Sequence, residues 1–426
     1  MLIAIIASLD LSMFAFDFTG AYLNAEPQGD NYLEIPKGFK NWFSIDNTDT
    51  VLHMLYNVYG TMDGGANWFL KLDSTFTELG HRASRSDPCV RVHHSPLGKT
   101  ITATYTDNMI GGSKSREAGA AVTKEMGERY ELKDLGEPDK ILGISIIRDK
   151  EAGTISLHQQ SLIRELVKEC KMTGCRPKYT PLPPNLNLIN SQSLPIPETD
   201  VFFMADKPYR GALGKMNHIG NGTRLNISYA MSFLMTFAID PRPVHWNLVQ
   251  HVVAYLDTTI SRLVTYRRGV PIKPLGFSDS SYADNPETRR STAGYVFTMA
   301  GGPVSWRAKS QSRVGTSTAE VKYVSLSESG KHGIWMRNWL HEMELFEDGP
   351  IELKTDNNAA ISIANRTVSG HSRLKHVDVK HHWIQEAVVK RDITVSYVPT
   401  SDNVADIFTK SLGRVQLEKL LGLLGM

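Results

Sequence analysis

Four acidic residues in the last third of the chain place the strongest constraint on its fold. Asp279, Glu320, Asp356 and Asp406 are separated by roughly 36 to 50 residues. Each lies in a different kind of local segment, so no helix or hairpin can bring them together. If these carboxylates act as one group, only a tertiary fold of about 150 residues can gather them.

The segments around the four acids predict a mixture of strands and helices. Asp279 lies in an apolar-to-polar run that predicts a strand, and Glu320 opens a long helical pattern after a Ser-Thr start signal. Asp356 ends a second strand, and Asp406 follows a third. The predicted elements are strands at 275–281, 351–356 and 394–398 and a helix from 317 to 339.

Converging carboxylates repel one another and raise one another's pKa unless a cation compensates them. Two Mg²⁺ or Mn²⁺ ions about 3.5–4 Å apart can activate a water molecule and stabilise the departing oxygen of a phosphodiester. Hard oxygen ligands suit these ions, and the three cysteines, Cys89, Cys170 and Cys175, have no zinc spacing. Taken singly, each acid is better explained as a solvated surface charge.

The surroundings of the acids resemble the ribonuclease H domain of copia-type (Ty1/copia) retrotransposon polyproteins. This resemblance implies that Asp279, Glu320, Asp356 and Asp406 are catalytic metal ligands. The sixth of seven matching runs is a polar helical face that either contacts phosphates or is solvated. The runs are Phe277–Ser280, Arg289–Tyr295, Ser305–Trp306, Ser317–Tyr323, Thr355–Ile361, Lys375–His382 and Ala405–Lys410.

The N-terminal half contains a second group of polar residues next to predicted strands. Alternation of apolar residues places Phe14, Phe16 and Phe18 on one face of a strand and Asp17 on the other. Asp107 and Asn108 fall at the tip of a predicted hairpin. An exposed acid and ordinary Asp-Asn turn chemistry are the competing interpretations.

Together these two segments resemble the palm of the reverse transcriptase from the same polyprotein. The resemblance implies that Asp17 and Asp107 bind Mg²⁺ and act in catalysis, and that Asn108 contacts the substrate. It places Tyr22 beneath the sugar of the incoming nucleotide; core packing is the alternative. Further matching runs are Tyr59–Gly60, Trp68, Asp87–Cys89, Leu132–Glu137, Leu142–Ile144, Tyr209–Arg210, Gly222–Arg224 and Ile227–Ala230.

Three departures from the palm pattern predict impaired polymerase activity. Asn108 stands where the family has a second Asp, and a charge pair at about 4 Å and a dielectric near 20 is worth up to ~4 kcal/mol. Losing half of that from the transition state would slow the chemistry more than ~10-fold. Only 16 residues precede Asp17, so the fingers are expected to be missing, and Asp63 with Gly64 replaces a Gln-containing turn.

Length and composition predict a protein of two or three domains with a mixed α+β and α/β fold. We expect a reverse transcriptase palm at 1–147, a thumb or connection region at 148–268 with a Pro-rich linker at 180–208, and a ribonuclease H-like domain at 269–426. The 47 Lys and Arg against 45 Asp and Glu give a net charge of +2, so any basic patch is local. The apolar residues 1–7 predict a buried helix rather than a signal peptide.

The resemblance implies a fragment that hydrolyses the RNA strand of RNA–DNA hybrids with Mg²⁺ or Mn²⁺ and has impaired RNA-directed DNA synthesis. Its expected partners are the hybrid, an RNA template and deoxynucleotides, with no membrane. By resemblance it resides in cytoplasmic virus-like particles or in the nucleus. One alternative is a catalytically inactive nucleic-acid-binding relic, and a weaker one is a host interaction module.

Overall fold

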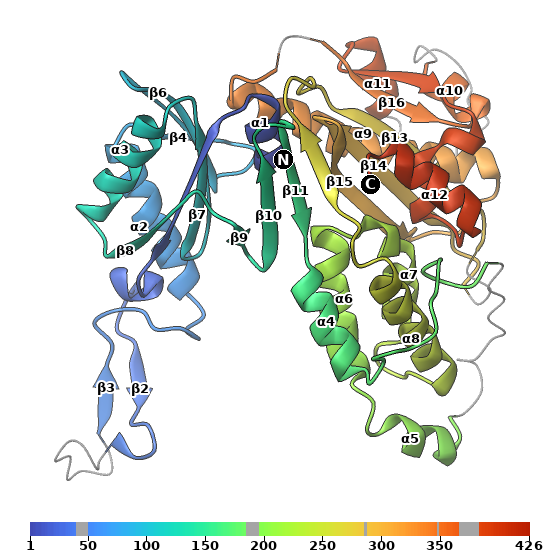
Figure 1. Cartoon of the computed structure of the whole chain (residues 1–426), viewed down its shortest axis with the longest axis horizontal. Helices are drawn as coiled ribbons and strands as arrows, with labels where there is room; N and C mark the ends of the chain where they lie inside the picture. Colours follow the sequence, from blue (N-terminus) through green and yellow to red (C-terminus); the bar gives the residue numbers. More distant parts are fainter. Residues whose placement is uncertain (40–49, 185–195, 285–287, 347–348, 366–382) are drawn as a thin grey trace. The chain divides into compact units, whose positions relative to one another are not determined.

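The computed structural model describes residues 1–39, 50–184, 196–284, 288–346, 349–365 and 383–426. The chain divides into two compact units (Figure 1). One comprises Leu11–Pro138, and the other comprises Ile3–Asp10 together with Asp139–Met426. Helices and strands mix in both, which confirms the predicted mixed fold class.

The first unit is built on a six-stranded antiparallel sheet with the order β4-β5-β6-β7-β1-β8. Its strands are β1 (Ser12–Phe18), β4 (Arg82–Ala83), β5 (Val90–Ser95), β6 (Gly98–Tyr105), β7 (Asn108–Ser113) and β8 (Leu132–Gly136). Its other elements are η1 (Ala21–Asn24), the hairpin of β2 (Tyr32–Glu34) and β3 (Val51–His53), α2 (Gly64–Glu78) and α3 (Arg116–Gly127).

The aromatic residues of β1 form the core of this first unit. Phe14, Phe16 and Phe18 share one buried cluster with residues of α2 and α3, which confirms the predicted alternation. The rings of Phe16 and Phe18 meet edge to face at 5.2 Å. Asp17 is only partly buried, so its carboxylate stays accessible beside this core.

The second unit contains a small antiparallel sheet and a group of helices. The sheet has the order β12-β11-β10-β9. The elements are α1 (Leu2–Ser8), β9 (Lys140–Ile141), β10 (Ile144–Asp149), β11 (Thr154–His158), α4 (Gln160–Glu169), α5 (Glu198–Met204), α6 (Tyr209–Gly222), η3 (Leu225–Ile227), α7 (Ser228–Leu234), η4 (Met235–Phe237), α8 (Pro243–Thr258) and β12 (Val264–Arg267). Ala4, Ile5 and Ile6 are fully buried, so the predicted buried N-terminal helix is confirmed.

The same unit contains a five-stranded mixed sheet with the order β15-β14-β13-β16-β17. β13, β14 and β15 pair antiparallel, whereas β16 pairs parallel to both β13 and β17. The elements are β13 (Leu275–Ser280), β14 (Thr292–Met299), β15 (Gly302–Ser310), α9 (Thr318–Glu342), β16 (Ile351–Thr355), α10 (Asn358–Ala364), α11 (Trp383–Val389), β17 (Ile393–Tyr397), η6 (Thr400–Asp402), η7 (Val404–Phe408) and α12 (Arg414–Leu423).

Hydrophobic residues cover this mixed sheet on both faces. On one face, α9 packs over β13, β14 and β16, with Phe297, Leu326 and Met336 in one buried cluster. On the other, Val296 and Phe408 join a larger cluster that includes residues of α4, α6, α7 and α8. The predicted regions 148–268 and 269–426 therefore share one core. The three-part division of the chain stays a prediction.

A close contact at Gly294 positions the segment that carries Asp406. Gly294 lies on β14, where η7 crosses the sheet. A Cβ at this position would lie 2.5 Å from Cβ of Phe408 and 3.2 Å from its backbone carbonyl carbon. Only a glycine leaves room for η7 at this distance from the strand.

We predict that Gly294→Ala lowers the free energy of unfolding by about 1–3 kcal/mol, because a buried backbone must move to make room. Urea denaturation followed by circular dichroism measures the change. Gly211→Ala is the matched control, since Gly211 is exposed on α6 with no atom within 4 Å of the added Cβ. The control should be neutral or stabilising by up to ~1 kcal/mol. Equal stability of both variants would contradict the packing described here.

Candidate functional site

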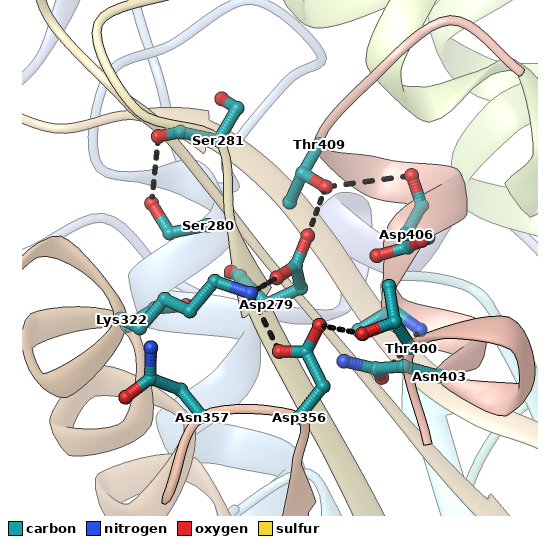
Figure 2. A network of polar contacts seen from close by, with 12 residues as sticks. Asp279, Ser280, Ser281, Lys322, Asp356, Asn357, Thr400, Asn403, Asp406 and Thr409 are labelled. Carbon is teal, nitrogen blue, oxygen red and sulfur yellow. Dashed lines mark hydrogen bonds and ion pairs between the residues drawn. The ribbon is translucent and has the colours of Figure 1, made fainter. Parts of the chain in front are cut away.

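Three of the predicted acids come together at one end of the mixed sheet (Figure 2). Asp279 lies near the end of β13, and Asp356 directly follows β16. Because these strands are parallel neighbours, their carboxyl ends meet at the same edge. Asp406 arrives from η7, which is tied to β13 by the amide of Asn403 donating to the backbone oxygen of Ser278 at 3.2 Å.

Two lysines lie among these carboxylates. The Nζ of Lys322, from α9, lies 2.8 Å from Oδ1 of Asp279 and 2.5 Å from Oδ1 of Asp356. The Nζ of Lys410 lies 2.8 Å from Oδ2 of Asp406 and 4.0 Å from Oδ2 of Asp279. The repulsion among the three acids is therefore compensated by the chain's own ammonium groups.

Threonine hydroxyls contact the remaining oxygens of two of the acids. Oγ1 of Thr409 donates to Oδ2 of Asp279 at 2.5 Å, and Oγ1 of Thr400 donates to Oδ2 of Asp356 at 2.8 Å. Both oxygens of Asp356 thus have a hydrogen-bond partner, whereas Oδ1 of Asp279 has an ion pair with Lys322 but no hydrogen bond among the described residues. Oδ1 of Asp406 is buried with no hydrogen-bond partner among the residues that the structure describes.

The pKa shifts follow from burial and from these contacts. Burial alone would raise the pKa of Asp279, but Lys322 and Lys410 outweigh it and hold that pKa below its ordinary value. Burial would lower the pKa of Lys322, but Asp279 and Asp356 raise it above its usual range. Burial, and then the charge of Asp279, raise the pKa of Asp406 to about 7. Asp279 and Lys322 therefore form a charged pair at neutral pH.

The structure does not bring Glu320 into this cluster. Its carboxylate accepts hydrogen bonds from the backbone nitrogen and Oγ1 of Thr316, at 2.7 and 2.6 Å. It lines a separate cavity whose walls include none of the three clustered acids. Helix geometry explains the difference, because residues two apart on a helix point about 200° away from each other. Lys322 faces Asp279, so Glu320 faces elsewhere.

The cluster does not fit the predicted pair of divalent cations. Such ions need direct contact with several carboxylate oxygens. Here Lys322 holds one oxygen each of Asp279 and Asp356, and threonines hold the others. Within the described part of the chain, no group of three or more His, Cys, Asp or Glu residues is arranged to hold a metal ion. Among the described residues, the charged partners of these acids are the two lysines.

The predicted palm residues also come together, in the first unit. Asp17 on β1 pairs in register with Asn108 on β7. Asp107 lies in the turn between β6 and β7, and its backbone oxygen accepts from the backbone nitrogen of Phe18 at 2.8 Å. The amide of Asn108 donates to Oδ1 of Asp107 at 2.8 Å. Asp17, Asp107 and Asn108 therefore form one group of two carboxylates and an amide.

Electrostatics in this group reflect two acids held close together. Burial, and then the charge of Asp107, raise the pKa of Asp17, and Lys133 partly opposes them. Because the Asn108 amide is uncharged, it adds no further repulsion. Two carboxylates and one amide oxygen are oxygen ligands suited to Mg²⁺, with less negative charge than three carboxylates would offer.

Tyr22 lies close to this group but has a packing role. Its ring stacks on Tyr59 with centroids 4.7 Å apart and an angle of 27°. It also lies beside the start of α2, where a Cβ on Gly65 would be 3.4 Å from its hydroxyl oxygen. The alternative of core packing accounts for these contacts, and a role beneath a sugar stays a prediction. Burial and the charge of Asp107 raise the pKa of Tyr59, which places that ring beside the acids.

The sequence analysis missed the lysines. Lys322 lies in the same run as Glu320, and Lys410 lies in the same run as Asp406. A helical projection of Ser317–Tyr323 would have separated Glu320 from Lys322. The predicted polar face at 375–382 lies outside the described residues.

Residues 1–184 match the reverse transcriptase (RNA-dependent DNA polymerase) family model. The chain is 30% identical over its whole length to the retrovirus-related Pol polyprotein from transposon TNT 1-94 of Nicotiana tabacum, of which it covers 32%. It is 25% identical, over 96% of its length, to the corresponding polyprotein from transposon RE2 of Arabidopsis thaliana, of which it covers 27%.

Among solved structures, an RNase H1 named LC11, in complex with an RNA/DNA hybrid, is 15% identical with a TM-score of 0.25. The match covers 32% of this chain and 94% of that one.

The matched residues define a reverse transcriptase segment, which the five-stranded mixed sheet follows in the chain. Residues 1–184 match the reverse transcriptase family, and the whole chain is similar to Pol polyproteins of Ty1/copia-type retrotransposons. It spans about a third or less of the length of the curated relatives named above. In the described part of the chain, no helix combines the length and the apolar character that a membrane span requires.

We predict that Asn108→Asp lowers the melting temperature by roughly 5 °C in EDTA at low salt, because a third carboxylate then lies beside Asp17 and Asp107. Adding Mg²⁺ should recover most of the loss by binding the three acids. Differential scanning fluorimetry measures both effects. Asn338→Asp, an exposed position on α9, is the matched control and should respond to neither change. A metal response equal in both variants would argue against a cation site at Asp17.

Proposed function

We propose that this chain is a reverse transcriptase/ribonuclease H segment that binds RNA–DNA hybrids without cutting their RNA strand. One observation carries the proposal: Lys322 lies between Asp279 and Asp356, where hydrolysis would need a metal ion. Among the functions expected from the sequence, this favours the nucleic-acid-binding relic over the two-metal hydrolase.

The chemistry of an ammonium group supports this choice. A divalent cation activates a water molecule by coordinating it and lowering its pKa. An ammonium supplies positive charge and three donors, but it has no open coordination position for a water molecule. Moving Lys322 aside would leave Asp279, with 2% of its side chain exposed, without its main compensating charge. Breaking a buried pair in this way typically costs about 3–5 kcal/mol.

A basic cavity beside the acid cluster supports nucleic-acid binding. The cavity has a volume of about 630 Å³ and lies between β14, β15 and α9. Its walls include four cations, Arg307, Lys309, Arg313 and Lys331, against two acids, Glu320 and Glu328. The register places Arg307 opposite Tyr295 and Lys309 opposite Ala293, on the face that lines the cavity. These cations are a local basic patch, which the net charge of +2 does not reveal.

Aromatic rings also line this cavity. His332 stacks on Tyr295 with centroids 5.3 Å apart and on Trp335 with centroids 5.2 Å apart. Basic groups beside rings are the combination by which proteins bind nucleic-acid strands. The proposed partner of the second unit is therefore an RNA–DNA hybrid, held through its phosphates.

For the first unit, we propose weak or absent nucleotide addition on an RNA template. Asp17 and Asp107 would hold Mg²⁺, with Asn108 contributing an amide oxygen. The missing negative charge at Asn108 weakens the stabilisation of the metal-bound transition state. Deoxynucleotides and an RNA template are the partners implied by this role.

We predict that the full chain binds a fluorescent RNA–DNA hybrid, with an affinity that falls as salt rises, and releases no RNA fragment in Mg²⁺ or Mn²⁺. Fluorescence anisotropy and a denaturing gel measure the two properties. The double variant Arg307→Ala with Lys309→Ala should bind roughly 10-fold more weakly, with a salt slope reduced by about 2. The control pair is Lys390→Ala with Lys419→Ala, on other surfaces of the same unit. RNA cleavage by the wild type would refute the proposal. An equal loss of hybrid affinity in both double variants would show that the cavity is not the binding site.

A further inference from the structure

We propose that the ammonium group of Lys322 replaces a divalent cation as the structural link between Asp279 and Asp356, so that Lys322→Glu converts a metal-independent site into a metal-binding one. This inference deepens the proposed function, since it rests on the acid cluster being closed to metal. It adds a claim about stability and metal affinity that cleavage assays do not test.

The geometry of Lys322 is that of a bridge. Its Nζ contacts one oxygen of Asp279 on β13 and one oxygen of Asp356 at the end of β16. It therefore joins the ends of two neighbouring strands through charge, as a cation bound by both carboxylates would. Figure 2 shows the side chain reaching from α9 to both acids.

The helix that carries Lys322 is fixed over the strand by hydrogen bonds. Ser325 follows Lys322 by three residues, so it lies on a neighbouring part of the same helix face. Its Oγ donates to the backbone oxygen of Asp279 at 2.6 Å, and Oγ of Ser278 lies 3.1 Å from it. The position of Lys322 is thus set by backbone contacts and not by its flexible side chain alone.

Burial makes this bridge necessary. The side chains of Asp279, Asp356 and Lys322 are 2%, 5% and 17% exposed. Buried carboxylates must be paired or bound to a cation. Lys410 is 41% exposed and contacts Asp406 more closely than Asp279, so it cannot substitute for Lys322. Asp356 has its charged contact with Lys322 alone among the ion pairs of the described residues.

Charge reversal at this position creates the ligand set that the wild type lacks. The three acids and two lysines carry a formal charge of −1, and Lys322→Glu changes it to −3. A Glu side chain ends one bond earlier than a Lys side chain, which leaves space between its carboxylate and those of Asp279 and Asp356. Several carboxylates around such a space are typical ligands for Mg²⁺ or Mn²⁺.

The test compares the wild type with Lys322→Glu, Lys322→Gln and a charge-reversal control, Lys390→Glu, in the full chain without nucleic acid. Melting temperature is measured in EDTA and in saturating Mn²⁺, and bound Mn²⁺ is counted by electron paramagnetic resonance. Once the site proposed at Asp17 is removed by Asp17→Asn, we expect no bound Mn²⁺ and no shift in melting temperature for the protein that retains Lys322 and for the control. Lys322→Glu should melt lower in EDTA, bind Mn²⁺, and gain roughly 5 °C when the metal is added.

Mn²⁺ held by the Asp17 group is removed from the comparison by repeating it in an Asp17→Asn background. In that background, two results would overturn the inference. One is Mn²⁺ binding by the protein that retains Lys322, and the other is a folded Lys322→Glu variant whose melting temperature does not change when Mn²⁺ is added. If Lys322→Glu fails to fold in EDTA, recovery of its circular dichroism on adding Mn²⁺ supports the inference. The inference is overturned if the circular dichroism of Lys322→Glu does not recover and the melting temperature of Lys322→Gln does not respond to Mn²⁺. Cleavage of a hybrid by the wild type would instead refute the proposed function.

Discussion

The salt bridge from Lys322 to Asp279 and Asp356 determines what the mixed sheet can do. Parallel pairing of β13 with β16 brings two carboxylates to one edge, and η7 adds a third. Without compensation, this arrangement would be unstable in a buried site. The chain supplies two ammonium groups, from Lys322 on α9 and from Lys410 just after η7. A fold that gathers carboxylates could in principle serve metal chemistry. In this protein the gathered carboxylates form ion pairs with lysines.

The two acid groups of the chain are compensated differently. In the second unit, two lysines compensate most of the charge of three buried acids. In the first, an amide at Asn108 replaces a charge and donates a hydrogen bond to Asp107. Both arrangements lower the repulsion that a metal ion would otherwise relieve. The first keeps a partly exposed Asp17, whereas in the second the Nζ of Lys322 contacts both Asp279 and Asp356.

Much of the architecture could be predicted from local patterns. Alternation predicted the buried face of β1, and the strand-turn-strand pattern predicted the hairpin that carries Asp107 and Asn108. The convergence of Asp279, Asp356 and Asp406 agreed with the family resemblance. The contacts of the Glu320 carboxylate with Thr316 depend on the phase of the helix, which the spacing of the acids does not reveal. The shared core of the second unit depends on contacts between distant segments, which no local pattern carries.

The shared core has a consequence for dividing the chain. Val296 on β14 and Phe408 in η7 are both 0% exposed because helices from the region before residue 260 cover that side of the sheet. The indole nitrogen of Trp306 also donates to the backbone oxygen of Gly220 at 3.0 Å, which ties β15 to α6. A polypeptide starting at residue 269 would present these apolar side chains to water and would tend to self-associate. The five-stranded sheet thus shares its apolar face with helices that come before it in the chain.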